Sequence, residues 1–267
     1  MRYRSSLIVA LAVCTPLALL PNTVLGQTAD SSGRPTTDHL ESHDDAVETV
    51  ILVHGLGRRA ASMAPLGRDL VAAGFRVVNV GYDSWRVPAT ELSVQLRDSI
   101  MACCQGAEER VHFVTHSLGG ILVRKYLSDH SPAHEGRVVM LSPPNQGSEI
   151  VDRLAAIPFL ESLLGPVGGD LGTDAESLPN RLGPAHFEVG VITGDKSLNP
   201  FYSWLIPGPD DGKVGVERAA LEGASGLLVV PYSHSFIMNR EPVLEEVIHF
   251  LENGRFSEEA IERFPPA

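Results

Sequence analysis

The chain has 267 residues, of which 43% are hydrophobic and 20% are charged, and its formal net charge is −12. This length suits one sizeable domain, and the composition is that of a globular protein rather than a disordered or repetitive one. The acidic balance argues against a nucleic-acid partner, because such a partner calls for a basic face.

The first 26 residues are typical of a secretory signal peptide. Arg2 and Arg4 form a basic start, residues 7–20 form an apolar core, and a cleavage site is predicted before Gln27. We therefore expect export to the periplasm or the extracellular space. An uncleaved N-terminal membrane anchor is the alternative, since the apolar run approaches the length that spans a bilayer. Residues 27–46 are polar and without periodicity, which predicts a flexible leader.

From residue 47 to residue 267 the pattern indicates a single domain in which apolar strands alternate with amphipathic helices. Such alternation implies parallel pairing with right-handed crossovers, so we predict an α/β fold of about six parallel strands with helices on both faces. Residues 149–185 lack this regularity and are predicted to form a cap or lid-like insertion. Strands are predicted at residues 48–53, 75–80, 111–116, 137–141, 187–193 and 227–230, and helices at residues 59–73, 90–104, 118–130 and 241–251.

The adjacent pair Cys103 and Cys104 is interpreted as two small apolar side chains on the inner side of a helix, because neighbouring cysteines rarely bond to each other. No H-x-x-x-H pattern and no paired Cys/His spacing occurs, so no metal site is predicted.

Residues 111–120 (VHFVTHSLGG) combine an apolar strand, a serine and the start of a helix. A serine on such a sharp turn is typical of the nucleophile elbow, which holds the hydroxyl out beyond the end of the sheet. Gly119 leaves room for the helix to pass close to the strand. The alternative is an ordinary strand-to-helix turn that happens to carry Ser117. The sequence departs from the usual G-x-S-x-G pattern at its first position, which is Thr115.

A serine hydroxyl needs a base to take its proton, and the base needs an acid to orient it. His234 is the histidine that matches both the expected chain order and a position just after the last strand. Three acids qualify by chain order, namely Asp195, Asp210 and Asp211. Asp195 follows the fifth strand directly, whereas Asp210 and Asp211 stand in a segment that is also a standard turn.

An oxyanion that forms during acyl transfer needs two preorganised backbone donors. The residue after the nucleophile, Leu118, supplies one N–H group. The loop that follows the first strand, residues 54–57 (HGLG), is shaped to supply the other from Leu56.

Four segments resemble the α/β-hydrolase superfamily, specifically its compact bacterial lipase and esterase branch: residues 50–57, 115–120, 142–148 and 211–214. In that branch an Asp-Gly-x-Val segment commonly carries the acid, so the resemblance implies Asp211, with Asp195 as the alternative. The chain departs from the branch at Thr115, where glycine or alanine is usual. The two strands that begin larger members have no counterpart, which again implies a six-stranded core.

The resemblance implies an exported serine hydrolase that acts on carboxylic esters through an acyl-enzyme, with Ser117, Asp211 and His234 as the triad. Alternatives on the same fold are an acyltransferase, a thioesterase, an amidase or a binding protein without activity. The expected partner is a small-molecule or lipid ester, with transient contact with a membrane or lipid surface. No cofactor, metal or protein partner is expected.

Overall fold

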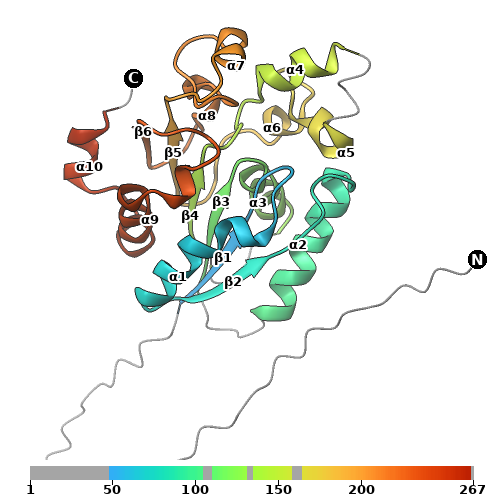
Figure 1. Ribbon diagram of the computed structural model, residues 1–267. Helices are drawn as coiled ribbons and strands as arrows, with labels where there is room; N and C mark the ends of the chain where they lie inside the picture. Colours follow the sequence, from blue (N-terminus) through green and yellow to red (C-terminus); the bar gives the residue numbers. More distant parts are fainter. Residues whose placement is uncertain (1–47, 105–109, 131–134, 158–163, 266–267) are drawn as a thin grey trace, which may run out of the picture. The chain divides into compact units, whose positions relative to one another are not determined.

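The computed structural model describes residues 48–104, 110–130, 135–157 and 164–265 (Figure 1). The predicted signal peptide and polar leader lie outside these residues. Within the described ranges, no helix combines the length and the apolar character needed to cross a bilayer.

Six strands form one parallel sheet in the order β2-β1-β3-β4-β5-β6, which confirms the predicted six-stranded core. Because β1 lies between β2 and β3, the chain reverses direction across the sheet at the β1–β3 boundary. In such sheets ligands bind beyond the carboxyl ends of the strands, near this boundary. The strands are β1 (Thr49–Val53), β2 (Arg76–Val80), β3 (Val111–His116), β4 (Glu135–Leu141), β5 (Val189–Gly194) and β6 (Gly226–Val230).

Helices cover both faces of the sheet (Figure 1). Alternate residues of β1 point to opposite faces, so that Ile51 and Val53 pack with α2 and α3, whereas Val50 and Leu52 pack with α1 and α9. The chain therefore buries two apolar layers, one on each side of the sheet. The main covering helices are α1 (Ala64–Ala72), which follows the 3₁₀ turn η1 (Ala60–Met63), and α2 (Ala89–Cys103), α3 (Leu118–Asp129) and α9 (Glu241–Asn253).

The predicted insertion folds as short helices near the carboxyl ends of the strands (Figure 1). Its apolar residues Leu164, Val167 and Leu171 are buried in the same core cluster as α2 and α3. These side chains therefore pack on the domain. The elements are α4 (Glu149–Ala155), α5 (Gly165–Gly168), η3 (Gly169–Leu171) and α6 (Leu178–Arg181), and after β5 follow α7 (Pro200–Leu205) and α8 (Val216–Ala219).

The chain ends in a helix that the sequence analysis did not predict, α10 (Glu258–Arg263). Ser257 caps this helix by accepting a hydrogen bond from the Ala260 N–H group at 3.0 Å, and Ser257 in turn donates to Glu246 at 2.6 Å. Phe256 and Phe264 on either side of it are buried against α9 and β6.

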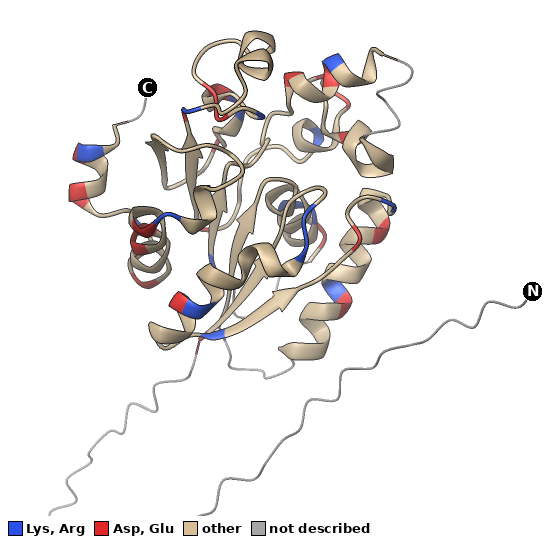
Figure 2. Ribbon diagram, in the orientation of Figure 1, with Lys and Arg blue, Asp and Glu red and all other residues tan. Residues whose placement is uncertain are grey.

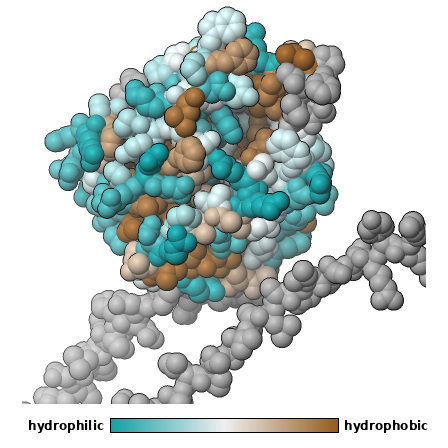
Figure 3. All heavy atoms as spheres, viewed as in Figure 1, coloured by the Kyte–Doolittle hydropathy of each residue, from teal (hydrophilic) through white to brown (hydrophobic). Residues whose placement is uncertain are grey.

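On the face shown in Figure 3, hydrophobic side chains form small groups separated by hydrophilic ones.

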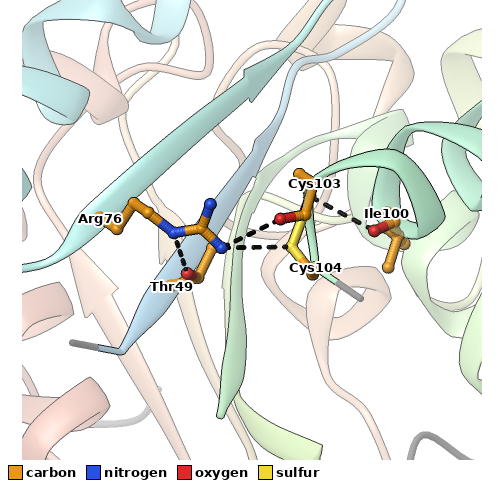
Figure 4. The surroundings of a disulfide bond; sticks show 5 residues. All are labelled: Thr49, Arg76, Ile100, Cys103 and Cys104. Carbon is orange, nitrogen blue, oxygen red and sulfur yellow. Dashed lines mark hydrogen bonds between the residues drawn. A yellow bond between two sulfur atoms is a disulfide. The ribbon is translucent and has the colours of Figure 1, made fainter. Parts of the chain in front are cut away.

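The interpretation of Cys103 and Cys104 as free apolar side chains is wrong, because the structure joins them in a disulfide (Figure 4). They do pack against the core on the inner side of α2, as predicted. Cys104 is the residue at which α2 ends, and its backbone leaves the helical conformation (φ −133°, ψ 51°). This change of direction distinguishes the pair from two neighbours inside a regular helix. Arg76 donates a hydrogen bond to the Cys103 carbonyl oxygen at 3.1 Å.

Gly190 in β5 provides a test of the packing between the sheet and α9. A Cβ atom at this position would lie 2.6 Å from the ring of Phe250 and 2.7 Å from the ring of Phe256. We expect Gly190→Ala to lower the free energy of unfolding by about 1–3 kcal/mol in a urea titration, because both rings must move. The matched control is Gly169→Ala, where a Cβ would meet no atom within 4 Å. Equal stability of the two variants would contradict this packing.

Candidate active site

Ser117 lies between β3 and α3 with an unusual backbone conformation (φ 54°, ψ −123°). Positive φ at a residue other than glycine costs about 1–3 kcal/mol, so the surrounding structure must hold it. The Ser117 N–H group donates to the Leu141 carbonyl oxygen at 2.9 Å, and the Ser117 carbonyl oxygen accepts from Gly120 N–H at 2.9 Å. A Cβ at Gly119 would lie 2.3 Å from the Val53 carbonyl oxygen, so only glycine fits there.

Thr115, where the sequence departs from the usual motif, is fully buried beneath this turn. A Cβ at Gly120 would lie 3.3 Å from the Thr115 hydroxyl oxygen, so the threonine packs directly against the first turn of α3. Its hydroxyl makes no hydrogen bond within the described part of the chain. The threonine therefore fills space at the turn without adding a polar contact.

Asp211 and His234 are joined by side chain and by backbone. Asp211 Oδ2 lies 2.8 Å from His234 Nδ1, and the Asp211 carbonyl oxygen accepts from the His234 N–H group at 3.0 Å. The other carboxylate oxygen, Oδ1, accepts from the N–H groups of Lys213 at 3.0 Å and Val214 at 2.9 Å. Both side chains are buried, with Asp211 2% exposed and His234 3% exposed.

These contacts keep the Asp211 carboxylate charged. Burial alone would raise its pKa, but the charge of His234 and the hydrogen bonds from His234 and Val214 outweigh burial and leave the pKa below its ordinary value. A charged Asp211 accepts a hydrogen bond from His234 Nδ1–H, which fixes the proton on Nδ1 and leaves the lone pair of Nε2 free to take a proton. The pair can therefore serve as an acid and a base.

The other two acids that qualify by chain order lie elsewhere. Asp195 makes an ion pair with Lys196 at 3.6 Å. Asp210 accepts hydrogen bonds from the Ser203 hydroxyl at 3.0 Å and from Gly212 N–H at 2.7 Å, so it shapes the loop that carries Asp211. Among the three, the structure brings Asp211 to His234.

His116, the neighbour of Ser117, supports the loop of His234. Its Nε2 lies 2.9 Å from the His234 carbonyl oxygen, and the centroids of the two rings are 4.8 Å apart. Burial, and then the charge of His234, hold the pKa of His116 well below its usual value. His116 is therefore neutral, and its Nε2–H group donates to the carbonyl oxygen. Because His116 directly precedes Ser117, this contact joins the turn of Ser117 to the loop of His234. No hydrogen bond joins the Ser117 and His234 side chains among the described residues.

The loop after β1 lies against Ser117. A Cβ at Gly55 would lie 3.0 Å from the Ser117 Cβ. The Leu56 N–H group donates no hydrogen bond within the described residues. Leu118 is the first residue of α3, so its N–H group has no partner inside the helix. These are the two predicted donors to an oxyanion.

Ser84 in the loop after β2 braces this oxyanion loop, and the sequence analysis missed it. Its hydroxyl oxygen accepts from Gly57 N–H at 3.0 Å and lies 3.4 Å from the Gly55 carbonyl oxygen, to which it donates. Ser84 is buried, so water does not compete for these hydrogen bonds. A serine in an irregular segment carries no pattern that would reveal this contact across 27 positions.

Two further braces join segments that are distant in sequence. Arg58 Nη2 donates to the Ser235 carbonyl oxygen at 3.1 Å, which ties the oxyanion loop to the loop of His234. The Ser148 hydroxyl donates to the Lys213 carbonyl oxygen at 2.8 Å, which ties the segment after β4 to the loop of Asp211.

In the part of the chain that the structure describes, no group of three or more His, Cys, Asp or Glu side chains could hold a metal ion.

Solved structures with a similar fold include a lipase, a carboxyl esterase and a phospholipase. The lipase BlEst2 of Bacillus licheniformis in its mature form has a TM-score of 0.60 at 19% identity, over 77% of this chain and 93% of that one. The metagenomic carboxyl esterase MGS0156 has a TM-score of 0.59 at 20% identity, over 81% of this chain and 74% of that one. The phospholipase PlaB of Legionella pneumophila, in complex with thio-NAD, has a TM-score of 0.61 at 16% identity, over 82% of this chain and 61% of that one.

These likenesses show that the chain has the α/β-hydrolase fold, as its motifs predicted. No protein-family model matches the chain. No curated protein sequence matches it either.

The state of His116 can be measured directly. We expect its imidazole to stay neutral, with the proton on Nε2, when the pH is lowered from 7.5 to 5.5, because burial disfavours its charged form. The measurement is a nitrogen–proton correlation NMR spectrum of the ring. Since the pKa is lowered on folding, the unfolded chain takes up this proton first as the pH falls below 6.5, and His116 makes folding less stable there. Protonation of His116 midway through this range would contradict the assignment.

Proposed function

We propose that this protein is a serine hydrolase that cleaves carboxylic esters through an acyl-enzyme. The observation that carries the proposal is the buried hydrogen bond between Asp211 and His234, beside the strained turn that presents Ser117. A charged acid, an oriented imidazole and a partly exposed hydroxyl on a sharp turn are the parts that nucleophilic acyl transfer requires.

In the first half-reaction the Ser117 hydroxyl oxygen attacks the ester carbonyl carbon while His234 Nε2 takes the hydroxyl proton. The N–H groups of Leu56 and Leu118 donate to the oxyanion of the tetrahedral intermediate. Collapse of this intermediate breaks the bond to the leaving alcohol, which receives the proton from His234. Asp211 accepts from Nδ1–H throughout and stabilises the imidazolium that forms.

In the second half-reaction water attacks the acyl-enzyme. His234 takes a proton from the water and returns it to Ser117 as the carboxylic acid leaves. The site residues of this cycle are all on the chain, so the proposed reaction needs no cofactor. The similarity in fold to a lipase, a carboxyl esterase and a phospholipase supports an ester as the bond that is cleaved.

We further propose that the substrate is met at a lipid surface outside the cytoplasm. Phe201 and Trp204 in α7 are 63% and 80% exposed, and such aromatic side chains are favoured where membrane meets water. Ser203 in the same helix donates to Asp210, so α7 is attached to the loop of the acid. Export rests on the predicted signal peptide, which lies outside the described residues.

Covalent labelling tests the role of Ser117. We expect a fluorophosphonate probe to label the wild-type protein and leave Ser117→Ala unlabelled, because the probe reacts with an activated serine hydroxyl. Ser128→Ala is the matched control, since this serine stands exposed on the same helix, α3, and its hydroxyl donates to the Lys125 carbonyl oxygen, away from Asp211 and His234. Labelling of both Ser117→Ala and wild type to the same extent would end the assignment.

Substitution of the acids tests Asp211. We expect Asp211→Asn to lower kcat for p-nitrophenyl ester hydrolysis by about a thousandfold or more, because the amide favours the wrong tautomer of His234. Asp195→Asn should retain most of the activity, since Asp195 pairs with Lys196. The reverse pattern, with activity lost in Asp195→Asn alone, would assign the acid to Asp195. Esters of increasing acyl length in the same assay would report the depth of the acyl pocket.

A further inference from the structure

A large cavity adjoins the oxyanion loop. It has a volume of about 830 Å³ and is lined by His54, residues 57–61 and residues 81–86, from the loops that follow β1 and β2. This volume is within the range of small-molecule sites. We call it the arginine-lined cavity, because three of its lining residues are Arg58, Arg59 and Arg86.

The charge of this lining is opposite to that of the chain. Three arginines face one acid, Asp83, whereas the whole chain carries a net charge of −12. Figure 2 shows basic segments (blue) on the loop after β1 and on the loop before α2, where these arginines stand. A positive cavity in an acidic protein favours an anionic ligand over a neutral one.

Two of the arginines are free to bind such a ligand. Arg59 is exposed, and its guanidinium makes no hydrogen bond or ion pair within the described residues. Arg86 meets Asp83 only at 3.8 Å, and its side chain is 83% exposed, so this pair contributes little. Arg58 is different, because it donates to the Ser235 carbonyl oxygen and so positions the loop of His234.

The cavity is connected to the site by rigid contacts. Ser84, in its wall, holds both Gly55 and Gly57 of the oxyanion loop. Trp85 packs on Gly57, where a Cβ would lie 3.2 Å from the indole ring. A Cβ at Gly165 of α5 would lie 2.4 Å from the Trp85 carbonyl oxygen, so the insertion covers this wall. The wall of the cavity is therefore fixed to the loop after β1, which carries the Leu56 amide and whose Gly55 packs against Ser117.

From this arrangement we propose that the arginine-lined cavity binds an anionic group, a phosphate or a carboxylate, of the ester substrate. The proposal rests on the proposed function and adds the substrate class to it. Arg59 and Arg86 present planar guanidinium groups, which match the geometry of phosphate and carboxylate oxygens. The scissile ester lies at Ser117, and the charged part of the substrate lies in the cavity.

A matched pair of esters tests the proposal, monodecanoylglycerol and monodecanoylglycerol phosphate, which differ only in the phosphate. We expect the wild-type protein to hydrolyse the phosphate with a kcat/KM at least about tenfold higher, as charge-assisted hydrogen bonds contribute. In the double variant Arg59→Gln/Arg86→Gln this ratio should fall towards one. The control Arg97→Gln removes an arginine of α2 that lies outside the cavity, and it should keep the wild-type ratio. Added NaCl should lower the ratio, because the arginines are exposed to solvent.

Calorimetry with the Ser117→Ala protein separates the cavity from catalysis. Glycerol phosphate should bind to this protein and should lose its affinity when Arg59 and Arg86 are also replaced. An equal kcat/KM for both esters, in a protein that hydrolyses them, overturns the substrate class and leaves the hydrolase standing. If inorganic phosphate binds to the cavity while the ester ratio stays at one, the cavity is a site for free phosphate and the proposal also fails. Failure to hydrolyse any ester overturns the proposed function, and the calorimetry alone then decides whether the cavity binds the anion.

Discussion

The close passage of α3 over the end of β1 is the constraint on which the site depends. At Gly119 the helix lies so near the Val53 carbonyl oxygen that a Cβ would be only 2.3 Å away. This approach allows the turn at Ser117 to adopt positive φ, and it brings Ser117 against Gly55 of the oxyanion loop. The cost of the strained turn is offset by the packing of α3 in the core, where most of its first two turns are buried.

A second requirement is that the buried charge of Asp211 be fully hydrogen-bonded. Its two carboxylate oxygens accept from His234 Nδ1 and from two backbone N–H groups, which offsets the loss of hydration. The loop around Asp211 is itself held by Ser148 and by the His234 N–H group. Asp211, His234 and their loops therefore form one connected network, and His116 joins this network to the turn of Ser117.

Charged side chains are arranged differently in the candidate active site and in the cavity that adjoins it. Near Ser117 the charges are paired and buried, whereas Arg59 and Arg86 in the adjoining cavity are exposed and available to a ligand. Backbone amides suit a charge that forms only during reaction, because they are neutral when no oxyanion is present. Exposed arginines suit a charge that the ligand carries before and after reaction. One donor of each kind, the Leu56 amide and the Arg59 guanidinium, comes from the segment after β1.

The sequence by itself determined the six parallel strands, their order along the chain and the edge at which the site lies, because these follow from local periodicity and from the handedness of crossovers. It also singled out Ser117 and His234 by their positions at strand ends. It left Asp195, Asp210 and Asp211 open on chain order alone, and only the contact at 2.8 Å places Asp211 on His234. Ser84 and Arg58 stand in irregular loops and act on partners 27 and 177 positions away, and His116, at the end of β3, acts on a partner 118 positions away, so no periodic signal reveals these contacts. The disulfide of Cys103 and Cys104 and the docking of α10 were likewise decided by tertiary structure, since a chain end and a helix end adopt the conformation that their packing selects.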